Sequence, residues 1–386
     1  MTASLAGTRV IDAATNIAGP FAASTLADLG ADVIKLEPLR GDPMRAYPPV
    51  GDGVQTQYAA VNHSKRYLAL DLRRPQGRDV LGRLLADADV LIQNLRPGHE
   101  ARLGLDAATV HAVNPRVVHA SVAAFHPADG DRPGYDLLVQ GESGLMDQTG
   151  EPDRPPSRIG AAAVDHVTGL WMALAILAEL GGERRSATVR VSMLDVAVGL
   201  LNEKVSAFMA TGEAPPRMGS GTSVTTPHGA FATADGYVVI GAATDESFAR
   251  LAAVLGPPLD GDERLLTQAG RLAHRGEMER RISQALAARG TDEWLAELAA
   301  AGVPVGRVAG LEEVTRRHRS DSATGFRPVE GVGAFEVLAP PVSFGEKRWP
   351  PLPAPRDPGG DGVEILAELG FDEAALAGLR SAGVIP

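Results

Sequence analysis

Residues 8–37 read TRVIDAATNIAGPFAASTLADLGADVIKLE, and this stretch decides the fold class. Residues 8–13 form a short apolar run that predicts a buried strand, and residues 32–37 predict a second strand. Between them, Pro20 suits the first turn of a helix, and Gly30 suits the position just after a helix ends. A strand, a helix and a strand in so short a stretch form a βαβ unit, which builds a parallel sheet.

The alternation of strand and helix continues through the first half of the chain. Strands are predicted over residues 67–72, 89–95, 116–122 and 187–193, and helices over residues 76–86, 167–180 and 194–209. We therefore expect an α/β fold whose large domain is a Rossmann-like, doubly wound parallel sheet.

A second, smaller α+β domain is expected after a change in composition. Residues 212–226 (GEAPPRMGSGTSVTT) have the composition of a linker, and Asp235-Gly236 predicts a type I′ hairpin turn inside the second domain. From Leu338 the chain is rich in proline, which favours extended chain poorly suited to a core. The expected division is a first part of the large domain at 1–211, a linker at 212–226, a small domain at 227–325, a Pro-rich connector at 326–360 and C-terminal helices at 361–386 that return to the large domain.

Composition excludes several classes of protein. The 386 residues include no cysteine, which rules out disulfides, cysteine zinc sites and thiol nucleophiles, and we expect no metal site. The formal net charge of −11 argues against a nucleic-acid partner. No apolar run reaches about 18 residues, and the N-terminus (MTASLAGTRV) lacks the apolar region of a signal peptide, so a cytoplasmic protein with no membrane partner is expected.

The usual nucleotide-binding fingerprints are missing from the first turn of the predicted sheet. The segment after the first strand reads AATNIAGP (residues 13–20), without the G-x-G-x-x-G pattern, and the chain has no P-loop. A dinucleotide-dependent oxidoreductase is therefore disfavoured. Any ligand of this sheet must be held by other residues.

Asp165 is the first candidate for chemistry. It precedes the apolar helix predicted at 167–180 and follows GAAAV (residues 160–164), which has no ionisable group. By position alone it could cap that helix, a role in which aspartate is common, or it could be a reactive carboxylate.

An ordered set of motifs covers nearly the whole chain. The motifs are 18–45 (AGPFAASTLADLGADVIKLEPLRGDPMR), 62–66 (NHSKR), 70–72 (LDL), 94–98 (NLRPG), 102–106 (RLGLD), 133–136 (PGYD), 163–169 (AVDHVTG), 233–236 (TADG) and 301–304 (AGVP). In this order they resemble the family III CoA-transferases, the CaiB/BaiF group, which includes α-methylacyl-CoA racemase.

The resemblance implies a CoA-transferase whose nucleophile is Asp165. In such a reaction the carboxylate attacks an acyl-CoA thioester and forms an acyl-aspartyl anhydride. The thiolate then returns to give an aspartyl-CoA thioester, which an acceptor carboxylic acid opens. Coenzyme A enters as part of the acyl-CoA substrate, and no resident cofactor is implied. The resemblance also implies an interlocked homodimer.

The CoA site implied by the resemblance lies in loops of the predicted sheet. It consists of Arg40, Asn62, His63, Ser64, Lys65, Asn94, Leu95, Arg96, Arg102 and Tyr135. From the residues alone, each of these basic side chains could instead be an ordinary solvated charge. On an acidic chain the phosphates of CoA need local cations, so we expect a basic cluster at this site.

Two further readings stay open. The racemase branch has a histidine in the middle of the Gly-x-Asp motif, where this chain has Tyr135, and a phenol is a poor base at neutral pH. His166 or His126 could substitute for that histidine, although His166 could also be an early helix residue that points elsewhere. The remaining alternative is a protein that binds acyl-CoA without catalysis.

Two departures from the family pattern concern the acyl pocket. Residues 218–223 (MGSGTS) hold only two glycines where formyl-CoA transferases have a glycine-rich run, and residues 121–126 (SVAAFH) differ from the usual S-x-x-G-F-G. Oxalate and formate are therefore disfavoured as substrates. Arg217 could meet an acceptor carboxylate or could be a solvated charge in the linker.

Overall fold

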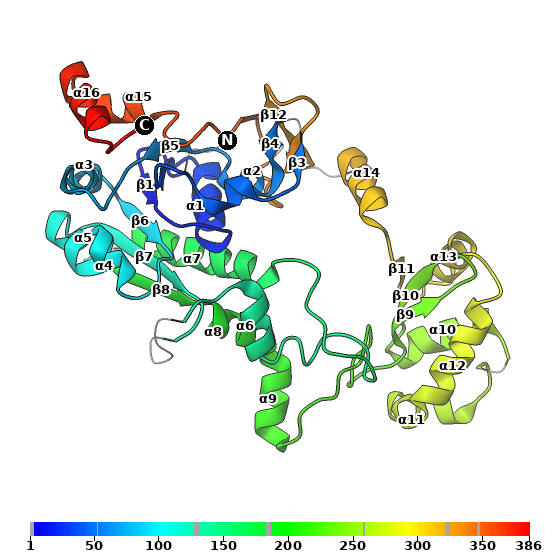
Figure 1. The fold of residues 1–386 in the computed structure, drawn as a ribbon. Coiled ribbons are helices and arrows are strands. Elements are labelled where there is room, and N and C mark those ends of the chain that lie inside the picture. The colour runs from blue at the N-terminus through cyan, green and yellow to red at the C-terminus, as the bar shows by residue number, and fades with distance from the viewer. Residues whose placement is uncertain are drawn as a thin grey trace. The chain divides into compact units, whose positions relative to one another are not determined.

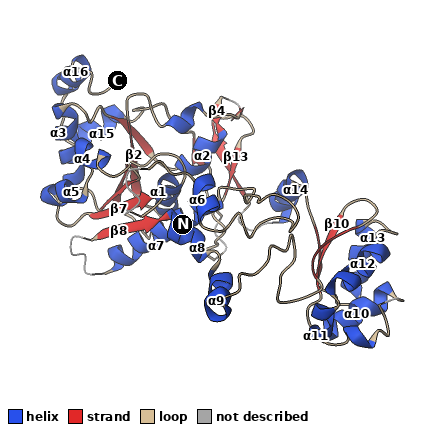
Figure 2. Ribbon diagram, turned by 60° about the horizontal axis from the view of Figure 1, so that its bottom comes forward, coloured by secondary structure: helices blue, strands red, loops and turns tan. Residues whose placement is uncertain are grey.

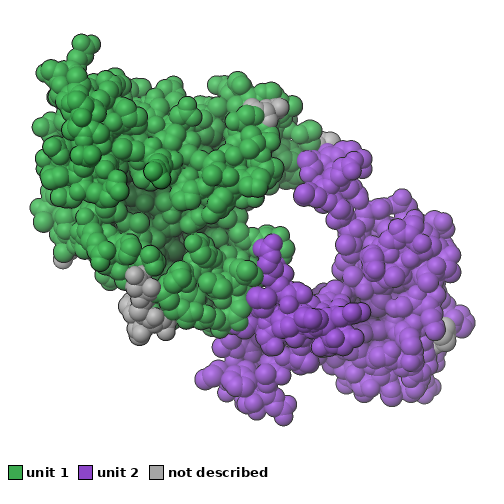
Figure 3. Space-filling view, viewed as in Figure 1, with its two compact units in different colours: residues 1–143, 160–200, 318–386 green, residues 144–159, 201–317 purple. Residues whose placement is uncertain are grey.

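A computed structural model describes residues 4–51, 53–126, 132–182, 187–257, 259–321, 325–345 and 348–386. The chain divides into two compact units (Figure 3). Unit 1 comprises residues 1–143, 160–200 and 318–386, and unit 2 comprises residues 144–159 and 201–317.

The centre of unit 1 is a six-stranded sheet in which every neighbouring pair is parallel (Figures 1 and 2). The strand order is β5-β2-β1-β6-β7-β8. The strands are β1 (Arg9–Asp12), β2 (Asp32–Glu37), β5 (Arg66–Ala69), β6 (Val90–Gln93), β7 (Val118–Ala123) and β8 (Thr188–Ser192). The predicted α/β fold with a parallel sheet is confirmed. The order reverses between β1 and β6, where open α/β sheets form a crevice at their carboxyl edge.

Helices cover both faces of this sheet. The unit 1 helices are α1 (Ala18–Asp28), α2 (Thr56–Asn62), α3 (Pro75–Ala86), α4 (His99–Leu103), α5 (Ala107–Val113), α6 (Asp136–Glu142), α7 (Ala163–Gly181), α8 (Met193–Gly199), α15 (Gly362–Glu368), α16 (Glu373–Ser381) and the 3₁₀ helix η1 (Pro43–Ala46). Leu91 belongs to a buried cluster with residues of α3, α5, α15 and α16. The next residue, Ile92, faces the other way and lies beside Gly19 of α1.

The helix expected over residues 194–209 is two helices. It breaks after Gly199, where α8 ends, and the chain resumes in α9 (Asn202–Thr211), which belongs to unit 2. Glycine in a helix interior costs about 0.5–1 kcal/mol relative to alanine, which favours a break at this position.

The connector predicted at 326–360 contains a small sheet, and the proline-rich stretch from Leu338 contributes Leu352 to its buried cluster. β12 (Phe326–Glu330) pairs with β13 (Glu336–Leu338) and β14 (Leu352–Pro353) in a small sheet, and a two-stranded ribbon, β3 (Val50–Gly51) and β4 (Val54–Gln55), lies in the same unit. The buried residues of this small sheet are Val329, Val332, Val337 and Leu352. The three valines precede the proline-rich stretch, and Leu352 of β14 adds to them from within it.

A buried ion pair fastens the small sheet to α1. The Arg327 Nη1 atom lies 2.5 Å from Oδ1 of Asp28, and Arg327 Nε donates to the Pro350 carbonyl oxygen at 2.8 Å. His63 Nε2 lies 3.0 Å from the second carboxylate oxygen of Asp28. Both members of the ion pair are almost fully buried.

We predict that Arg327→Met lowers the free energy of unfolding by about 3 kcal/mol, because the Asp28 carboxylate stays buried without its main partner. Urea denaturation measures the loss. The double variant Arg327→Met/Asp28→Asn is the control and should recover most of the lost stability. A single variant as stable as the wild type would contradict the assignment.

Unit 2 is an antiparallel sheet packed against helices. Its strands have the order β11-β10-β9. The elements are β9 (His228–Ala232), β10 (Tyr237–Gly241), α10 (Asp245–Leu255), η3 (Glu263–Leu265), α11 (Gln268–Ala273), α12 (Arg275–Leu286), α13 (Thr291–Ala300), β11 (Val305–Arg307) and α14 (Leu311–Asp321), whose last residues fall in unit 1. The predicted hairpin is present, but Asp235 and Gly236 lack the positive φ that a type I′ turn requires, and the Thr233 N–H donates to the Gly236 carbonyl oxygen at 2.9 Å. The Asp235 carboxylate accepts the Thr291 N–H at 2.8 Å and thus satisfies a backbone donor at the start of α13.

Within the described ranges, α7 is the one helix whose length and apolar composition would allow it to cross a membrane. Core helices of globular proteins meet the same criterion. α7 packs against α1, β7 and β8, and it carries Asp165, His166 and Glu179.

Candidate active site

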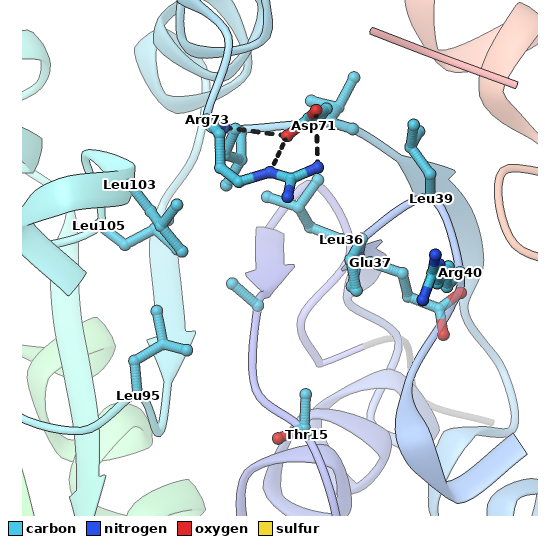
Figure 4. Close-up of a pocket in the computed structure, with 14 residues that line it drawn as sticks. Thr15, Leu36, Glu37, Leu39, Arg40, Asp71, Arg73, Leu95, Leu103 and Leu105 are labelled. Atoms are coloured by element: carbon cyan, nitrogen blue, oxygen red, sulfur yellow. Dashed lines mark hydrogen bonds and ion pairs between the residues drawn. The ribbon is translucent and has the colours of Figure 1, made fainter. Parts of the chain in front are cut away.

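A pocket of about 630 Å³ lies at the carboxyl edge of the parallel sheet (Figure 4). Its walls come from the segments that follow β1, β2, β5 and β6. The lining residues are Ala13, Thr15, Leu36, Glu37, Pro38, Leu39, Arg40, Leu70, Asp71, Leu72, Arg73, Leu95, Leu103 and Leu105. The pocket therefore occupies the crevice at which this strand order predicts a ligand.

The walls of the pocket are apolar and its polar groups are few. In Figure 4, Leu95, Leu103 and Leu105 lie on one side, and Arg40 lies on the other. Arg73 is bound to Asp71 by two hydrogen bonds, Nε to Oδ1 at 2.8 Å and Nη2 to Oδ2 at 3.0 Å. The pKa of the Asp71 carboxyl is lowered, mainly because of these hydrogen bonds.

Arg40 is an exposed cation at the pocket wall. In the part of the chain that the structure describes, it forms no ion pair. An apolar wall with an unpaired guanidinium at its edge suits an aromatic ring joined to phosphate groups, as in a nucleotide.

Arg40 and Leu95 are the two predicted CoA-site residues that line the pocket directly. Asn94 and Arg96 flank Leu95, and Arg102 precedes the lining residue Leu103 on α4. Arg96 and Arg102 are exposed. The structure thus brings this part of the predicted set to one edge of the sheet.

The predicted residues Asn62, His63 and Lys65 point into the protein. The Lys65 ammonium donates to Asp12 Oδ2 at 2.8 Å, to Asn62 Oδ1 at 2.9 Å and to the Pro20 carbonyl oxygen at 2.9 Å. Burial lowers the pKa of Lys65 to about 8, against the opposing effect of Asp12. His63 is occupied with Asp28. In this arrangement the Lys65 charge is satisfied by protein oxygens, and its place in the CoA site stays a prediction.

Ser64 and Tyr135 are the remaining members of the predicted set. Ser64 is half-buried and has a φ of 61°, in the left-handed region, between α2 and β5. Tyr135 precedes α6 and is 60% exposed. Neither residue lines the pocket.

Asp165 lies in the first turn of α7 and is half-buried. The helix begins at Ala163, so the alternative in which Asp165 caps the helix is wrong. Asp136, which lies in α6, caps the start of α7 instead. Its Oδ2 atom accepts the N–H of Val164 at 2.9 Å and that of Asp165 at 3.3 Å. Gln140 donates to the other oxygen of Asp136 at 2.5 Å.

The environment of Asp165 favours its neutral form more than water does. Burial, and secondarily the negative charge of Asp136, raise the pKa of Asp165 to about 7. Catalytic carboxylates are often poorly solvated, with a pKa close to the pH at which the enzyme works.

The first two turns of α1 and α7 pack closely together. A Cβ atom at Gly169 would lie 2.6 Å from the Ala18 carbonyl oxygen. The His166 and Phe21 rings are arranged edge to face, with their centroids 4.8 Å apart. His166 Nδ1 lies 2.8 Å from the Ala162 carbonyl oxygen. Because α1 starts just after the pocket residue Thr15, this packing joins the helix of Asp165 to the pocket loop, although Asp165 does not itself line the pocket.

Apart from Arg40 and Leu95, none of the lining residues belongs to the predicted CoA site, and the missed residues include Thr15, Leu72 and Arg73. The LDL motif at 70–72 was a usable signal for the last two, because it ends a predicted strand at the ligand edge. Within the described ranges, no group of three or more metal-ligating side chains comes together.

Comparison with known proteins gives a consistent result. A family model described as CoA-transferase family III matches residues 5–361. An acyl-CoA transferase of Fusarium pseudograminearum is 33% identical over 402 residues, which cover 99% of this chain and 88% of that protein. A succinate–glutarate CoA-transferase of Agrobacterium fabrum is 35% identical over 324 residues, which cover 80% of this chain and 81% of that protein.

The fold agrees with the sequence matches. A crystal structure of a CaiB/BaiF family protein from Brucella suis superposes with a TM-score of 0.83 at 33% identity, covering 95% of this chain and 99% of that chain. The sequence motifs, the family model and the similar crystal structure each cover nearly the whole chain. The chain therefore belongs to CoA-transferase family III.

Proposed function

We propose that this CoA-transferase moves CoA from an acyl-CoA thioester to a carboxylic acid through covalent intermediates on Asp165. The observation that carries the proposal is the setting of Asp165. Its carboxyl is half-buried in the first turn of α7, where Asp136 anchors the backbone and burial raises the pKa of Asp165 to about 7. Its helix packs on the helix that follows the pocket loop.

The reaction proceeds by four acyl transfers. An Asp165 oxygen attacks the thioester carbonyl, the C–S bond breaks and CoA leaves as thiolate. The thiolate attacks the Asp165 carbonyl of the anhydride, releasing the donor acid and leaving an aspartyl-CoA thioester. The acceptor carboxylate opens this thioester to a new anhydride and frees the thiolate again. The thiolate finally attacks the acceptor carbonyl, which gives the new acyl-CoA and restores the Asp165 carboxylate.

Positioning supplies much of the rate, because a carboxylate is a weak nucleophile. Holding the reacting groups in place can contribute about 7–11 kcal/mol to lowering the barrier. The pocket suits the nucleotide part of CoA, and Arg40 supplies a cation for its phosphates. Asn94, Leu95, Arg96 and Arg102 belong to the same proposed site.

The pH profile of the reaction should report Asp165. Below a pKa of about 7 the carboxyl is protonated and cannot attack, so kcat/KM should rise with pH and level off above neutrality. Asp136→Asn keeps an oxygen for the Val164 N–H but removes the neighbouring charge, so the pKa of Asp165 should fall and the rise should move to lower pH. Steady-state kinetics across pH measure both curves. An unchanged midpoint in the variant would contradict the electrostatic role of Asp136.

One assay separates the proposed function from its alternatives. The enzyme is incubated with succinyl-CoA and glutarate, the acids named for a 35% identical relative, and then with a wider panel of acids, while both acyl-CoA species are followed by chromatography. CoA transfer that depends on the acceptor supports the proposal. Exchange of the α-proton in heavy water without any acceptor would indicate a racemase, and binding without either reaction would indicate an acyl-CoA-binding protein.

The enzyme is further proposed to act as an interlocked homodimer in the cytoplasm. Support comes from the apolar side chains that α7 leaves uncovered: Leu170, Trp171 and Leu174 are each half exposed. α9 has no buried residue at all, and its exposed Phe208 and Met209 are neighbours in the sequence. Faces of this kind are typical of subunit interfaces. Light scattering of the full-length protein tests the dimer.

A further inference from the structure

Four charged side chains form a fully buried cluster at the carboxyl ends of β1 and β2. The Lys65 ammonium lies 2.8 Å from Oδ2 of Asp12, and the Lys35 ammonium lies 3.5 Å from the same oxygen. Lys35 also lies 3.3 Å from Oδ2 of Asp42. All four side chains have zero exposure, so two positive and two negative charges balance inside the protein.

This cluster holds the peptide groups of Ala14, in the loop between β1 and α1. Oδ1 of Asp12 accepts the Ala14 N–H at 3.1 Å, and the Lys35 ammonium donates to the Ala14 carbonyl oxygen at 2.5 Å. Asn94 holds the next residue in the same way: its Oδ1 accepts the Thr15 N–H at 2.9 Å and its amide donates to the Thr15 carbonyl oxygen at 2.7 Å. Side chains therefore satisfy the backbone donor and acceptor of two successive loop residues.

The held loop is part of the pocket. Ala13 and Thr15 line the pocket, and Figure 4 shows the Thr15 side chain among the lining residues. The next residue, Asn16, has a φ of 62°, a left-handed conformation that is uncommon outside glycine and must be supported by its surroundings.

Stability alone does not explain the cluster. Moving four charges out of water is costly, and well-packed apolar side chains of similar volume are often equally stabilising. Loops at the ligand edge of a sheet are otherwise the mobile part of such folds. The specific consequence of the cluster is a loop whose shape is set before the ligand arrives, which reduces the entropy lost on binding.

We propose that Lys35 is a positioning residue of the transferase: through the Ala14 carbonyl its buried ammonium fixes the 13–16 loop in the shape that receives CoA. The inference rests on the proposed function, because it takes the pocket to be the CoA site. Lys35 touches no substrate and acts through the backbone.

The double variant Lys35→Met/Asp42→Asn tests the proposal without leaving an unpaired charge. The asparagine side-chain oxygen can still accept the Met44 N–H, as Asp42 does now at 2.9 Å, and Asp12 still holds the Ala14 N–H. Calorimetric titration with free CoA should show binding weakened about 10-fold or more, because ordering even one loop residue costs roughly that factor. KM for acyl-CoA should rise by the same factor, with little change in kcat.

Arg271→Met is the control for the general effect of losing a buried cation. Arg271 is fully buried in unit 2 and donates to the carbonyl oxygens of Thr226, Leu265 and Ala243. Its loss should lower the melting temperature and leave CoA binding unchanged. Equal CoA affinity in wild type and double variant would overturn the positioning role, as would a fall in kcat without a rise in KM. A wild type that binds no CoA would instead overturn the pocket assignment and the proposed function.

Hydrogen exchange on the unliganded wild type gives a second test that needs no variant. The amide protons of Ala14 and Thr15 should be protected as strongly as those within β1, because each is held by a side chain. Exchange as fast as in exposed loops would show that the loop is not held, and would overturn the proposal even if the double variant failed to fold.

Discussion

Asp165→Asn should reduce CoA transfer by about 10⁴-fold or more, because an amide of nearly the same shape cannot form the anhydride. The helix should remain intact, since the contacts that fix the start of α7 come from Asp136 and involve backbone N–H groups. Steady-state assay of both acyl-CoA species measures the loss, and circular dichroism checks the fold. Binding of CoA should persist, because Asp165 does not line the pocket.

A control on the same helix is Glu179→Gln. Glu179 lies near the other end of α7, and its substitution should leave kcat and KM close to the wild-type values. Transfer at a tenth or more of the wild-type rate in Asp165→Asn would show that another group forms the covalent intermediate, or that none forms.

Gly169→Ala should damage both stability and activity. The new Cβ would lie 2.6 Å from the Ala18 carbonyl oxygen and 3.0 Å from the Phe21 ring, so α1 and α7 must move apart. Overpacking of this kind costs about 1–3 kcal/mol of unfolding free energy. The shift also moves Asp165, one turn earlier, relative to the pocket loop, and a displacement of about 1 Å can cost roughly 10²-fold in rate. Thermal denaturation and kcat/KM measure the two effects.

Gly181→Ala is the matched control at the end of the same helix. Among the described residues, and apart from the backbone of α7 itself and the two neighbours in sequence, no atom lies within 4 Å of the Cβ that this change would add. Alanine also favours helix over glycine. Stability should stay the same or rise slightly, with unchanged activity. If Gly169→Ala behaved like Gly181→Ala, close packing of α1 on α7 would not be what positions Asp165.

The fold was predictable because local patterns and tertiary structure agree in the first half of the chain. The strand predicted at 32–37 is β2 residue for residue, and the helix that starts near Pro20 is α1. The break between α8 and α9 was missed, since the apolar pattern runs on across Gly199 and the interruption shows only in the backbone.

The position of the candidate pocket was predictable from the sequence, but the contacts of the side chains around it were not. Arg40 and Leu95 line the pocket because strand ends of a parallel sheet meet at one edge. The direction of Lys65 was not predictable, because its main charged partner, Asp12, lies 53 positions away in the sequence. Likewise α7 starts before Asp165 because Asp136, from another helix, supplies the capping oxygen.

The most direct test of the proposed mechanism is chemical trapping on the wild-type protein. The enzyme is incubated with acyl-CoA and hydroxylamine, digested and mapped by mass spectrometry. An anhydride or thioester on Asp165 reacts to give a hydroxamate at that residue, which requires acyl-CoA and is absent from Asp165→Asn. An unmodified Asp165 in enzyme that turns over under the same conditions, or a hydroxamate at another carboxyl, would contradict the mechanism.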